Sequence, residues 1–372
     1  MKKKYLDIAV LGGGNGGFAA AADFTLQGHN VRLWRHDTEA VARHAASGNV
    51  LSMRDATGTH EAKISLITND MATAVNGAAV IVCTTPAFAQ NDIAKLLAPL
   101  LRDDQVVYLP PGTLGSVLFA HEQYLAGNKA RTAFAETGTL PWLARKSGPE
   151  GITISGRATR LPTGVFPAIH AGWALPLLDQ VFPGVIEDCG DALSGALMNA
   201  GPVIHPPLII MNAGPLEHFP AWDIHAEGTQ PMIRKVTDAL DNERIALREA
   251  MGYGAPHFPL RDHYDLSDDE WMYGRKAHDG LTDSGDWREK IDLAHHRYMM
   301  EDTRLGLSLL AAVSAVTRTD VPLVKAFLSI GSAMCGINFL THGRSLENVG
   351  LGGLDRVALL ERLRVGFEAG VK

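Results

Sequence analysis

The sequence predicts an N-terminal α/β domain with a doubly wound parallel sheet, followed by a C-terminal domain made of helices. An apolar run near the start ends in a glycine-rich turn, and a helix-forming segment follows it. Apolar runs and helix-forming segments then alternate to about residue 185, where long helical segments begin. The 372 residues also suit two cores better than one. We assign residues 1–186 to the first domain and residues 187–372 to the second.

The first element is the apolar run 5–11, which predicts a buried strand leading to glycines spaced G-x-G-x-x-G. Gly12 allows a tight turn, Gly14 lets a pyrophosphate approach, and Gly17 lets the helix over 18–26 pack on the strand. Phosphates would bind the unpaired N–H groups at the start of that helix. We therefore expect a Rossmann-type dinucleotide site, the alternative being an ordinary glycine-rich turn. The predicted cofactor-binding residues of the turn are Gly12, Gly14, Asn15, Gly16 and Gly17.

Further strands and helices alternate along the first domain, which predicts a parallel sheet with right-handed crossovers. The run 78–85 is almost continuously apolar, as in a strand that is buried on both faces. Thr84, Thr85 and Pro86 end this strand and are expected beside the ribose or nicotinamide of the cofactor. The other predicted strands are 30–34, 62–68, 105–109, 131–136, 152–155 and 164–169, and the other helices are 38–47 and 91–101.

The second half is predicted to be helical, apart from a polar segment, 254–290, that Gly and Pro interrupt. We expect this segment to cross the surface or the active site. Ligands bind at the carboxyl ends of parallel strands, so the substrate should lie in the cleft that faces the helical domain. The predicted helices are 193–204, 231–251, 298–316, 322–334 and 354–367.

Composition argues against several classes of function. The net charge of −7 provides no basic field for nucleic acid or an anionic membrane. The first apolar run is too short for a signal peptide or a membrane span. Cys83, Cys189 and Cys335 are far apart, which fits reduced thiols and a cytoplasmic location. The fifteen histidines show no metal-ligand spacing, so we expect no metal.

Arg35 directly follows the second predicted strand and favours NADP over NAD. In NAD-selective domains an acidic residue binds the ribose 2′-OH, whereas an arginine nearby accommodates a 2′-phosphate. The first acid here, Asp37, comes two residues after Arg35, and His36 or Arg32 could add a donor. The alternative is a solvated Arg35 with Asp37 bending back to the ribose, so NAD remains possible.

Several segments together resemble the octopine/nopaline (opine) dehydrogenase family over nearly the whole chain. The resemblance implies NAD(P)H-dependent reduction of the imine formed from an α-keto acid and an amino acid or amine. The product would be a secondary amine dicarboxylate, and we also expect a homodimer. The matching segments are Leu-Gly-Gly-Gly-Asn-Gly-Gly at 11–17, Pro-Pro-Gly-Thr-Leu-Gly-Ser at 110–116, Ala-Glu-Thr-Gly-Thr-Leu-Pro-Trp at 135–142, Met-Asn-Ala-Gly-Pro-Val-Ile-His-Pro at 198–206 and His-Arg-Tyr-Met-Met-Glu-Asp at 296–302.

The resemblance implies a catalytic role for His205, with Asp302 orienting its imidazole and Arg297 binding a substrate carboxylate. His205 precedes Pro206 and Pro207, where we expect the helix to stop. On an α-helix, side chains five residues apart diverge by about 140°. We therefore expect Arg297 just before the helix that carries Asp302. The alternative for His205 is a helix-terminal or core histidine. The alternative for Arg297 is a surface ion pair with Glu301, which would leave Asp302 solvated.

Other candidates are assigned less sharply. Asn199 could bind the nicotinamide or the substrate, or cap a helix. Glu136 matches a family segment and is a cofactor-binding candidate, or it could be a packing residue. Of His295 and His296, at most one should face the cleft, and residues 298–300 are expected in the core.

Three functions remain open. Other dehydrogenases that join a Rossmann domain to a helical one resemble each other in using a lysine of the helical domain. The corresponding segment here, 194–204, has no lysine, which favours the opine type. A 2-keto acid or other carbonyl reductase, and a non-catalytic NAD(P)-binding protein, are the alternatives.

Overall fold

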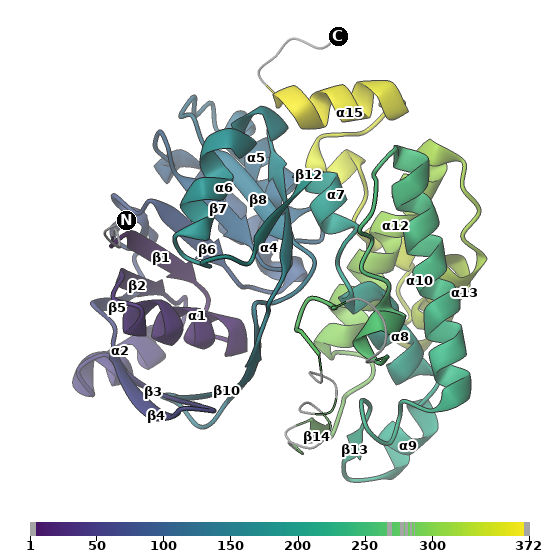
Figure 1. Ribbon diagram of the computed structural model, residues 1–372, viewed down its shortest axis with the longest axis horizontal. Coiled ribbons are helices and arrows are strands. Elements are labelled where there is room, and N and C mark those ends of the chain that lie inside the picture. The colour runs from purple at the N-terminus through teal and green to yellow at the C-terminus, as the bar shows by residue number, and fades with distance from the viewer. Residues whose placement is uncertain are drawn as a thin grey trace.

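Figure 1 shows the computed structural model, which describes residues 5–265, 270–275, 279, 282, 285 and 287–367. A sheet domain and a helical domain lie side by side, as predicted, with helix α15 (Arg356–Val365) at the top of the view. Helix α15 contacts β11 (Leu161–Phe166) and the short helix η3 (Ala168–His170). The end of the described chain therefore returns to the sheet domain.

The main sheet has eight strands in the order β12-β11-β8-β7-β6-β1-β2-β5. All neighbours are parallel except β11 and β8, so the predicted doubly wound parallel sheet is present with one antiparallel pairing. The edge strand β12 runs past the predicted domain boundary to Asp191. Besides β11, the strands are β1 (Asp7–Leu11), β2 (Asn30–Trp34), β5 (Leu66–Thr68), β6 (Val80–Cys83), β7 (Val106–Leu109), β8 (Ala133–Thr137) and β12 (Ile186–Asp191).

A second sheet, which the sequence did not predict as a separate sheet, packs on helix α1 (Asn15–Leu26). The predicted strand 152–155 belongs to it, and the predicted strand 62–68 is divided between it and the main sheet. Its strand order is β4-β3-β10-β9. Short polar strands such as β4, which has a single buried residue, lack the continuous apolar signal of the main sheet. The strands are β3 (Val50–Asp55), β4 (Gly58–Lys63), β9 (Trp142–Lys146) and β10 (Gly151–Arg157).

The two faces of the main sheet belong to different cores. Alternate residues of β1 separate them, with Ile8 and Val10 packed with α1 and Ala9 and Leu11 packed in the other core. The latter core continues into the helical domain, so the two domains share one apolar interior. The remaining helices of this domain are α2 (Thr38–Ala46), α3 (Met71–Val75), η1 (Ala87–Ala89), α4 (Gln90–Leu97), η2 (Ala98–Leu100), α5 (Gly115–Leu125) and α6 (Ala171–Asp179).

The helical domain contains helices at the predicted segments, several further short helices, and a two-stranded sheet of β13 (Trp222–Asp223) and β14 (Arg288–Glu289). Its first predicted helix, 193–204, is in fact two helices. The helices are α7 (Ala192–Ala196), α8 (Gly201–Ile210), α9 (Ala213–His218), α10 (Pro231–Met251), η4 (Leu260–His263), η5 (Tyr298–Gly306), α12 (Leu307–Thr317), α13 (Pro322–Cys335), α14 (Phe339–His342) and η6 (Glu347–Val349).

The prediction that a helix stops at Pro206 is wrong. Helix α8 continues through Pro206 and Pro207 to Ile210. Each proline removes one backbone hydrogen bond, but both rings are buried, and α8 packs closely on η5. Packing therefore outweighs the local preference, and His205 lies in the middle of α8 rather than at its end.

Among the described residues no single helix is long and apolar enough to cross a membrane. One pair of segments, Pro322–Cys335 and Phe339–Val349, reaches that length and hydropathy only when joined, across a bend of 95°.

Candidate active site

The glycine-rich turn connects β1 to α1 as the sequence predicted. Gly12 has a φ of +116°, which L side chains rarely adopt, and a Cβ on Gly17 would lie 1.8 Å from the carbonyl oxygen of Gly12. A Cβ on Gly14 would meet nothing within 4 Å, so this position is open to a ligand. A Cβ on Gly16 would approach Leu140 and Thr84 within 3.0 Å. The turn has the tight packing and the open face that a bound pyrophosphate requires.

The residues after β6 pack against this turn. The Thr85 methyl group lies 2.8 Å from the position of a Gly12 Cβ. Within the described part of the chain, the buried hydroxyl of Thr84 has no hydrogen-bond partner, so its bonding capacity is left for a ligand at the turn. Pro86 precedes η1, whose first backbone N–H, that of Ala87, donates to Glu301 of the helical domain.

Arg35 lies directly over the glycine turn, where a Cβ on Gly13 would come within 2.3 Å of its Nε. Its Nη1 donates to Nε2 of His44, 2.7 Å away. Lys146, from β9, places Nζ 3.9 Å from the centroid of the Phe18 ring and 3.4 Å from the carbonyl oxygen of Gly13. Burial lowers the pKa of Lys146, and the positive charge of Arg35 adds to this. Two cations thus converge on the turn.

Two neighbouring polar side chains of the cofactor region serve the protein itself. Asp37 accepts a hydrogen bond from the backbone N–H of Ala40 and so caps α2. The Asn15 side chain accepts from the backbone N–H of Lys146 and ties the start of α1 to β9. The Oδ1 atom of Asp37 thus holds the start of α2.

Glu136, which was expected either at the cofactor or as a packing residue, makes the contacts of a packing residue. Its side chain is completely buried, and its carboxylate accepts from the backbone N–H groups of Leu114 and Ser116 at 2.8 and 2.9 Å. These bonds hold the start of α5, where Leu114 has a φ of 61°. Burial raises the pKa of Glu136 to about 7, while the N–H donors and the charge of Arg344 oppose the shift. Glu136 is a packing residue, the alternative that the sequence left open.

A cavity lies between the two domains at the carboxyl ends of the strands. Residues of the sheet domain after β8 form one wall, and α8 and the start of η5 form the other. The described part of segment 254–290 closes it, as the sequence suggested. The residues of these three regions that line the cavity include Thr139, Leu143, Arg145, Asn199, His205, Trp271, Tyr273, Trp287, Arg297, Tyr298, Glu301 and Asp302.

His205 and Asp302 form a hydrogen-bonded pair in this cavity. Nδ1 of His205 lies 2.7 Å from Oδ2 of Asp302, and the two side chains are 13% and 6% exposed. The ring of Tyr298 stacks on the imidazole with the centroids 3.8 Å apart. The pair leaves Nε2 of His205 as the ring nitrogen available to a bound molecule.

Burial disfavours the charged forms of both partners. It raises the pKa of Asp302 to about 7, against the charge of Arg297. It also lowers the pKa of His205 well below its usual value, and the charges of Arg297 and Arg145 lower it further. Because the two groups share one hydrogen bond, they titrate as a coupled pair.

Arg297 and Asp302 reach the same cavity because η5 is a π-helix. Arg297 directly precedes it, as expected, and the backbone N–H of Leu307 bonds to the carbonyl of Asp302, five residues back. In this winding, side chains five positions apart return to one face, whereas an α-helix would separate them. π-Helical turns occur frequently at functional sites.

The Arg297 guanidinium faces open space. Its side chain is 47% exposed although its neighbours are buried, because it borders the cavity. Its Nε forms an ion pair with Oε2 of Glu301 at 3.8 Å, as the alternative from the sequence expected, but this distance is too long for a hydrogen bond. Glu301 is held in turn by the N–H of Ala87, at 3.0 Å. A carboxylate from a ligand could therefore bind the guanidinium fork.

Asn199 lies in the break between α7 and α8. Its Oδ1 accepts from the N–H of Gly201 at 3.0 Å, and its Nδ2 donates to Oγ1 of Thr113 at 3.1 Å. The side chain thus starts α8 and joins it to the sheet domain, while it also lines the cavity. Asn199 forms a local turn that leads into α8, but it is not the capping residue, because the N-cap position of α8 is Ala200, which has no side-chain cap.

Several residues at the site were not singled out from the sequence. Tyr298 lies in the core, as expected, and also lines the cavity beside His205. His296 contacts Tyr298, at 4.3 Å between ring centroids, and His295 pairs with Asp292 at the surface. Arg145 and Lys146 were missed with the strand that carries them, although two adjacent basic residues after an apolar run were a usable signal.

Comparisons with known proteins match both domains. Residues 188–335 match the family model described as NAD/NADP octopine/nopaline dehydrogenase, alpha-helical domain. Residues 7–110 match the model of the NAD-dependent glycerol-3-phosphate dehydrogenase N-terminus. These matches confirm the prediction of a Rossmann-type domain followed by a helical domain. They also confirm the resemblance to opine dehydrogenases.

Similar proteins align over most of the chain. An opine dehydrogenase of Arthrobacter sp. (strain 1C) is 29% identical over 94% of this chain and 97% of its own. Octopine dehydrogenase of Pecten maximus is 23% identical over 90% and 92%. A structure of octopine dehydrogenase in complex with NADH and agmatine superposes with a TM-score of 0.73 at 19% identity, over 95% of this chain and 98% of that chain. Yersinopine dehydrogenase with NADP⁺ bound gives 0.66 at 15%, over 98% and 99%.

Proposed function

We propose that this protein, whose helical domain matches the octopine/nopaline dehydrogenase family model, is an NAD(P)H-dependent opine dehydrogenase. It condenses an α-keto acid with an amino acid or amine and reduces the resulting imine to a secondary amine. The observation that carries the proposal is the buried His205–Asp302 pair, which shares a cavity with an open arginine, Arg297.

Condensation releases one water, and reduction of the imine adds a hydride to carbon and a proton to nitrogen. The reduced nicotinamide supplies the hydride when it is bound. His205 delivers the proton from Nε2 while Asp302 holds Nδ1 and stabilises the protonated pair. Arg297 binds a substrate carboxylate through its fork and so fixes the reacting carbon near His205.

The glycine-rich turn fits a dinucleotide on three counts. The open face at Gly14, the partnerless hydroxyl of Thr84 and the cations Arg35 and Lys146 all surround the start of α1. The N–H groups at that helix start would bind the pyrophosphate.

The finer proposal is that NADPH is the preferred cofactor. Arg35 and Lys146 repel each other, so their convergence over Gly13 favours an added anion such as a 2′-phosphate. His44 holds the Arg35 guanidinium in place, and Asp37 is occupied in capping α2. This assignment replaces His36 and Arg32 by His44 and Lys146 as the supporting residues.

Binding of 2′,5′-ADP and of ADP tests this preference without any substrate. We expect 2′,5′-ADP to bind about tenfold or more tightly than ADP, since each charge-assisted contact contributes about 1.5–3 kcal/mol. Arg35→Asp should remove that difference and leave ADP binding nearly unchanged. Equal affinities in the unmodified protein would contradict the proposal.

Oxidation of NADPH with a keto acid, in the presence and absence of an amine, tests the overall function. NADPH oxidation that occurs only with the amine supports imine reduction. Equal rates of NADPH oxidation with and without the amine would favour a 2-keto acid reductase, whose reaction the same His–Asp pair could catalyse. The expected homodimer and cytoplasmic location remain proposals, which gel filtration with light scattering and cell fractionation would test.

A further inference from the structure

Arg145 is a second arginine in the cavity that the proposed mechanism does not use. Among the described residues that line the cavity, Arg145 and Arg297 are the only arginine or lysine side chains. They come from different domains, Arg145 from β9 and Arg297 from the start of η5. Both charges act on His205, so both lie near the proposed reaction centre.

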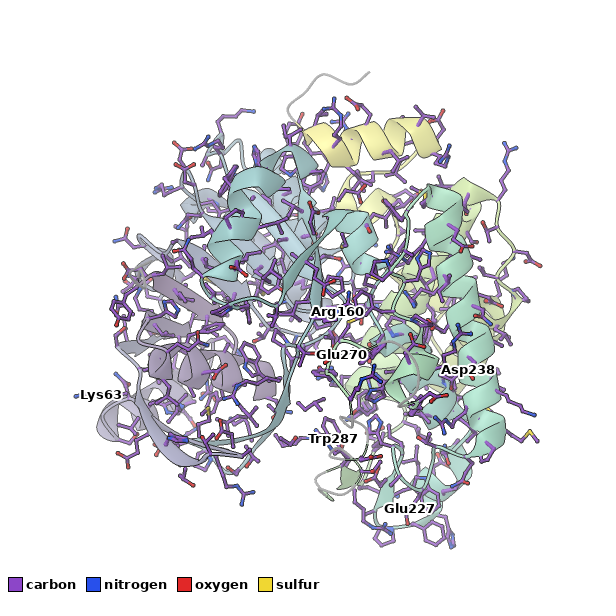
Figure 2. All side chains as sticks on the ribbon, viewed as in Figure 1. Lys63, Arg160, Glu227, Asp238, Glu270 and Trp287 are labelled. Carbon is purple, nitrogen blue, oxygen red and sulfur yellow. The ribbon has the colours of Figure 1, made fainter. Side chains whose placement is uncertain are left out.

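Strand β9 directs its two basic side chains to different places. Successive residues of a strand point to opposite faces. Lys146 therefore reaches the glycine turn, while Arg145 reaches the cavity and lies over the Trp287 ring, 4.0 Å from the centroid to Cζ. Figure 2 shows Trp287 between the two domains.

The guanidinium of Arg145 is oriented but incompletely paired. Nη2 donates to Oε1 of Glu289 at 2.8 Å, its one hydrogen bond within the described part of the chain. Its Nε is buried and has no hydrogen-bond partner among the described residues, which is costly for a charged donor. Trp287 and Glu289 thus position the fork and leave donors for another group.

We propose that Arg145 is the second carboxylate-binding residue of the site, so that Arg145 and Arg297 each bind one carboxylate of the substrate pair. This inference rests on the proposed function, because the imine of a keto acid and an α-amino acid carries one carboxylate on each side of the C=N bond. Two guanidinium forks match those two groups. The enzyme then selects α-amino acids over simple amines, or keto acids over ketones.

The Arg145→Met variant tests the inference with substrates that differ by one carboxylate. The amine arm compares L-arginine with agmatine, or another accepted amino acid with its decarboxylated amine. The carbonyl arm compares pyruvate with acetone. For the pair with both carboxylates we expect kcat/KM to fall about 10- to 100-fold, mainly through KM. In one of the two arms, the variant and the unmodified enzyme should have nearly equal kcat/KM for the substrate without a carboxylate. That arm shows whether Arg145 binds the carboxylate of the amino acid or that of the keto acid.

Arg160→Met is the matched control. Arg160 also pairs with a glutamate, Glu187, and lies over an aromatic ring, that of Phe258, but it is outside the cavity. The control should keep the kinetic constants of the unmodified enzyme. An equal loss in every arm for Arg145→Met, or no loss, would overturn the inference.

Binding of a product-like probe separates this inference from the proposed function. Iminodiacetate carries two carboxylates around a secondary amine, and N-ethylglycine carries one. Titration into the NADP⁺ complex should show tighter binding of iminodiacetate, and Arg145→Met should abolish that advantage. If the unmodified protein binds iminodiacetate more tightly than N-ethylglycine but shows no turnover, only the proposed function is contradicted. If the protein turns over substrates and Arg145→Met keeps the preference for iminodiacetate, only the inference about Arg145 is contradicted.

Discussion

Replacing Asp302 by Asn removes one charge from the His205–Asp302 pair and changes its shape very little. The 2.7 Å contact joins two buried side chains, so solvent screens it weakly. A hydrogen bond to a charged group is worth about 1.5–3 kcal/mol, and burial favours the upper end of this range. At about 1.4 kcal/mol per tenfold, the variant should lose about 100-fold in kcat.

The pH profile provides the second readout. The pKa of Asp302, raised to about 7, makes the proton-carrying form of the pair abundant below that pH and scarce above it. The rate of imine reduction should therefore fall as the pH rises through about 7, and Asp302→Asn should move or remove this limb. Steady-state rates over this range, with the NADPH dissociation constant as a control for folding, measure both effects. A kcat within about threefold of the unmodified enzyme would refute the role assigned to the pair.

Three further changes follow from the contacts at the two sites. Arg297→Lys should raise the KM for a carboxylate substrate about tenfold with little effect on NADPH binding, because an ammonium lacks the bidentate fork; an unchanged KM would remove Arg297 from the site. Gly17→Ala should lower the free energy of unfolding by about 1–3 kcal/mol, because its Cβ would meet the carbonyl of Gly12. Gly14→Ala should leave the free energy of unfolding unchanged and weaken cofactor binding, because its Cβ enters the open face of the turn. Denaturant titration and cofactor titration of the two variants distinguish these effects. Folding raises the pKa of Glu136 from 4.5 to about 7, so between these pH values the folded protein binds more protons than the unfolded protein. The free energy of unfolding should therefore fall as the pH rises through this range. Glu136→Gln should make the free energy of unfolding less dependent on pH, and an unchanged pH dependence would contradict the assignment.

Part of the order of strands and helices in the sheet domain could be predicted, because the signals of those elements are local. The apolar runs of β1 and β6, and the glycines between β1 and α1, each determine one piece of backbone. Helix α5 was missed because it starts after a left-handed Leu114 that a distant carboxylate, Glu136, stabilises. No pattern within a short window reports such a contact.

The site was only partly predictable for a related reason. His205, Arg297 and Asp302 were identified by resemblance, but spacing alone would have separated the last two. Their convergence depends on the π-helical winding of η5, which tertiary packing against α8 supports. Likewise, Arg145 gains a role only when β9 and the segment that contains Trp287 come together.

Mass analysis of the product tests the central claim most directly. Purified protein is incubated with NADPH, a panel of α-keto acids and a panel of amino acids or amines, and the products are compared with those of His205→Ala. The account predicts NADPH oxidation that depends on the amine, and a product with the mass of keto acid plus amine, minus water, plus two hydrogens. The His205→Ala variant should lose about 10²–10⁴-fold of this activity and keep its NADPH affinity. A 2-hydroxy acid formed at the same rate without the amine would contradict the account.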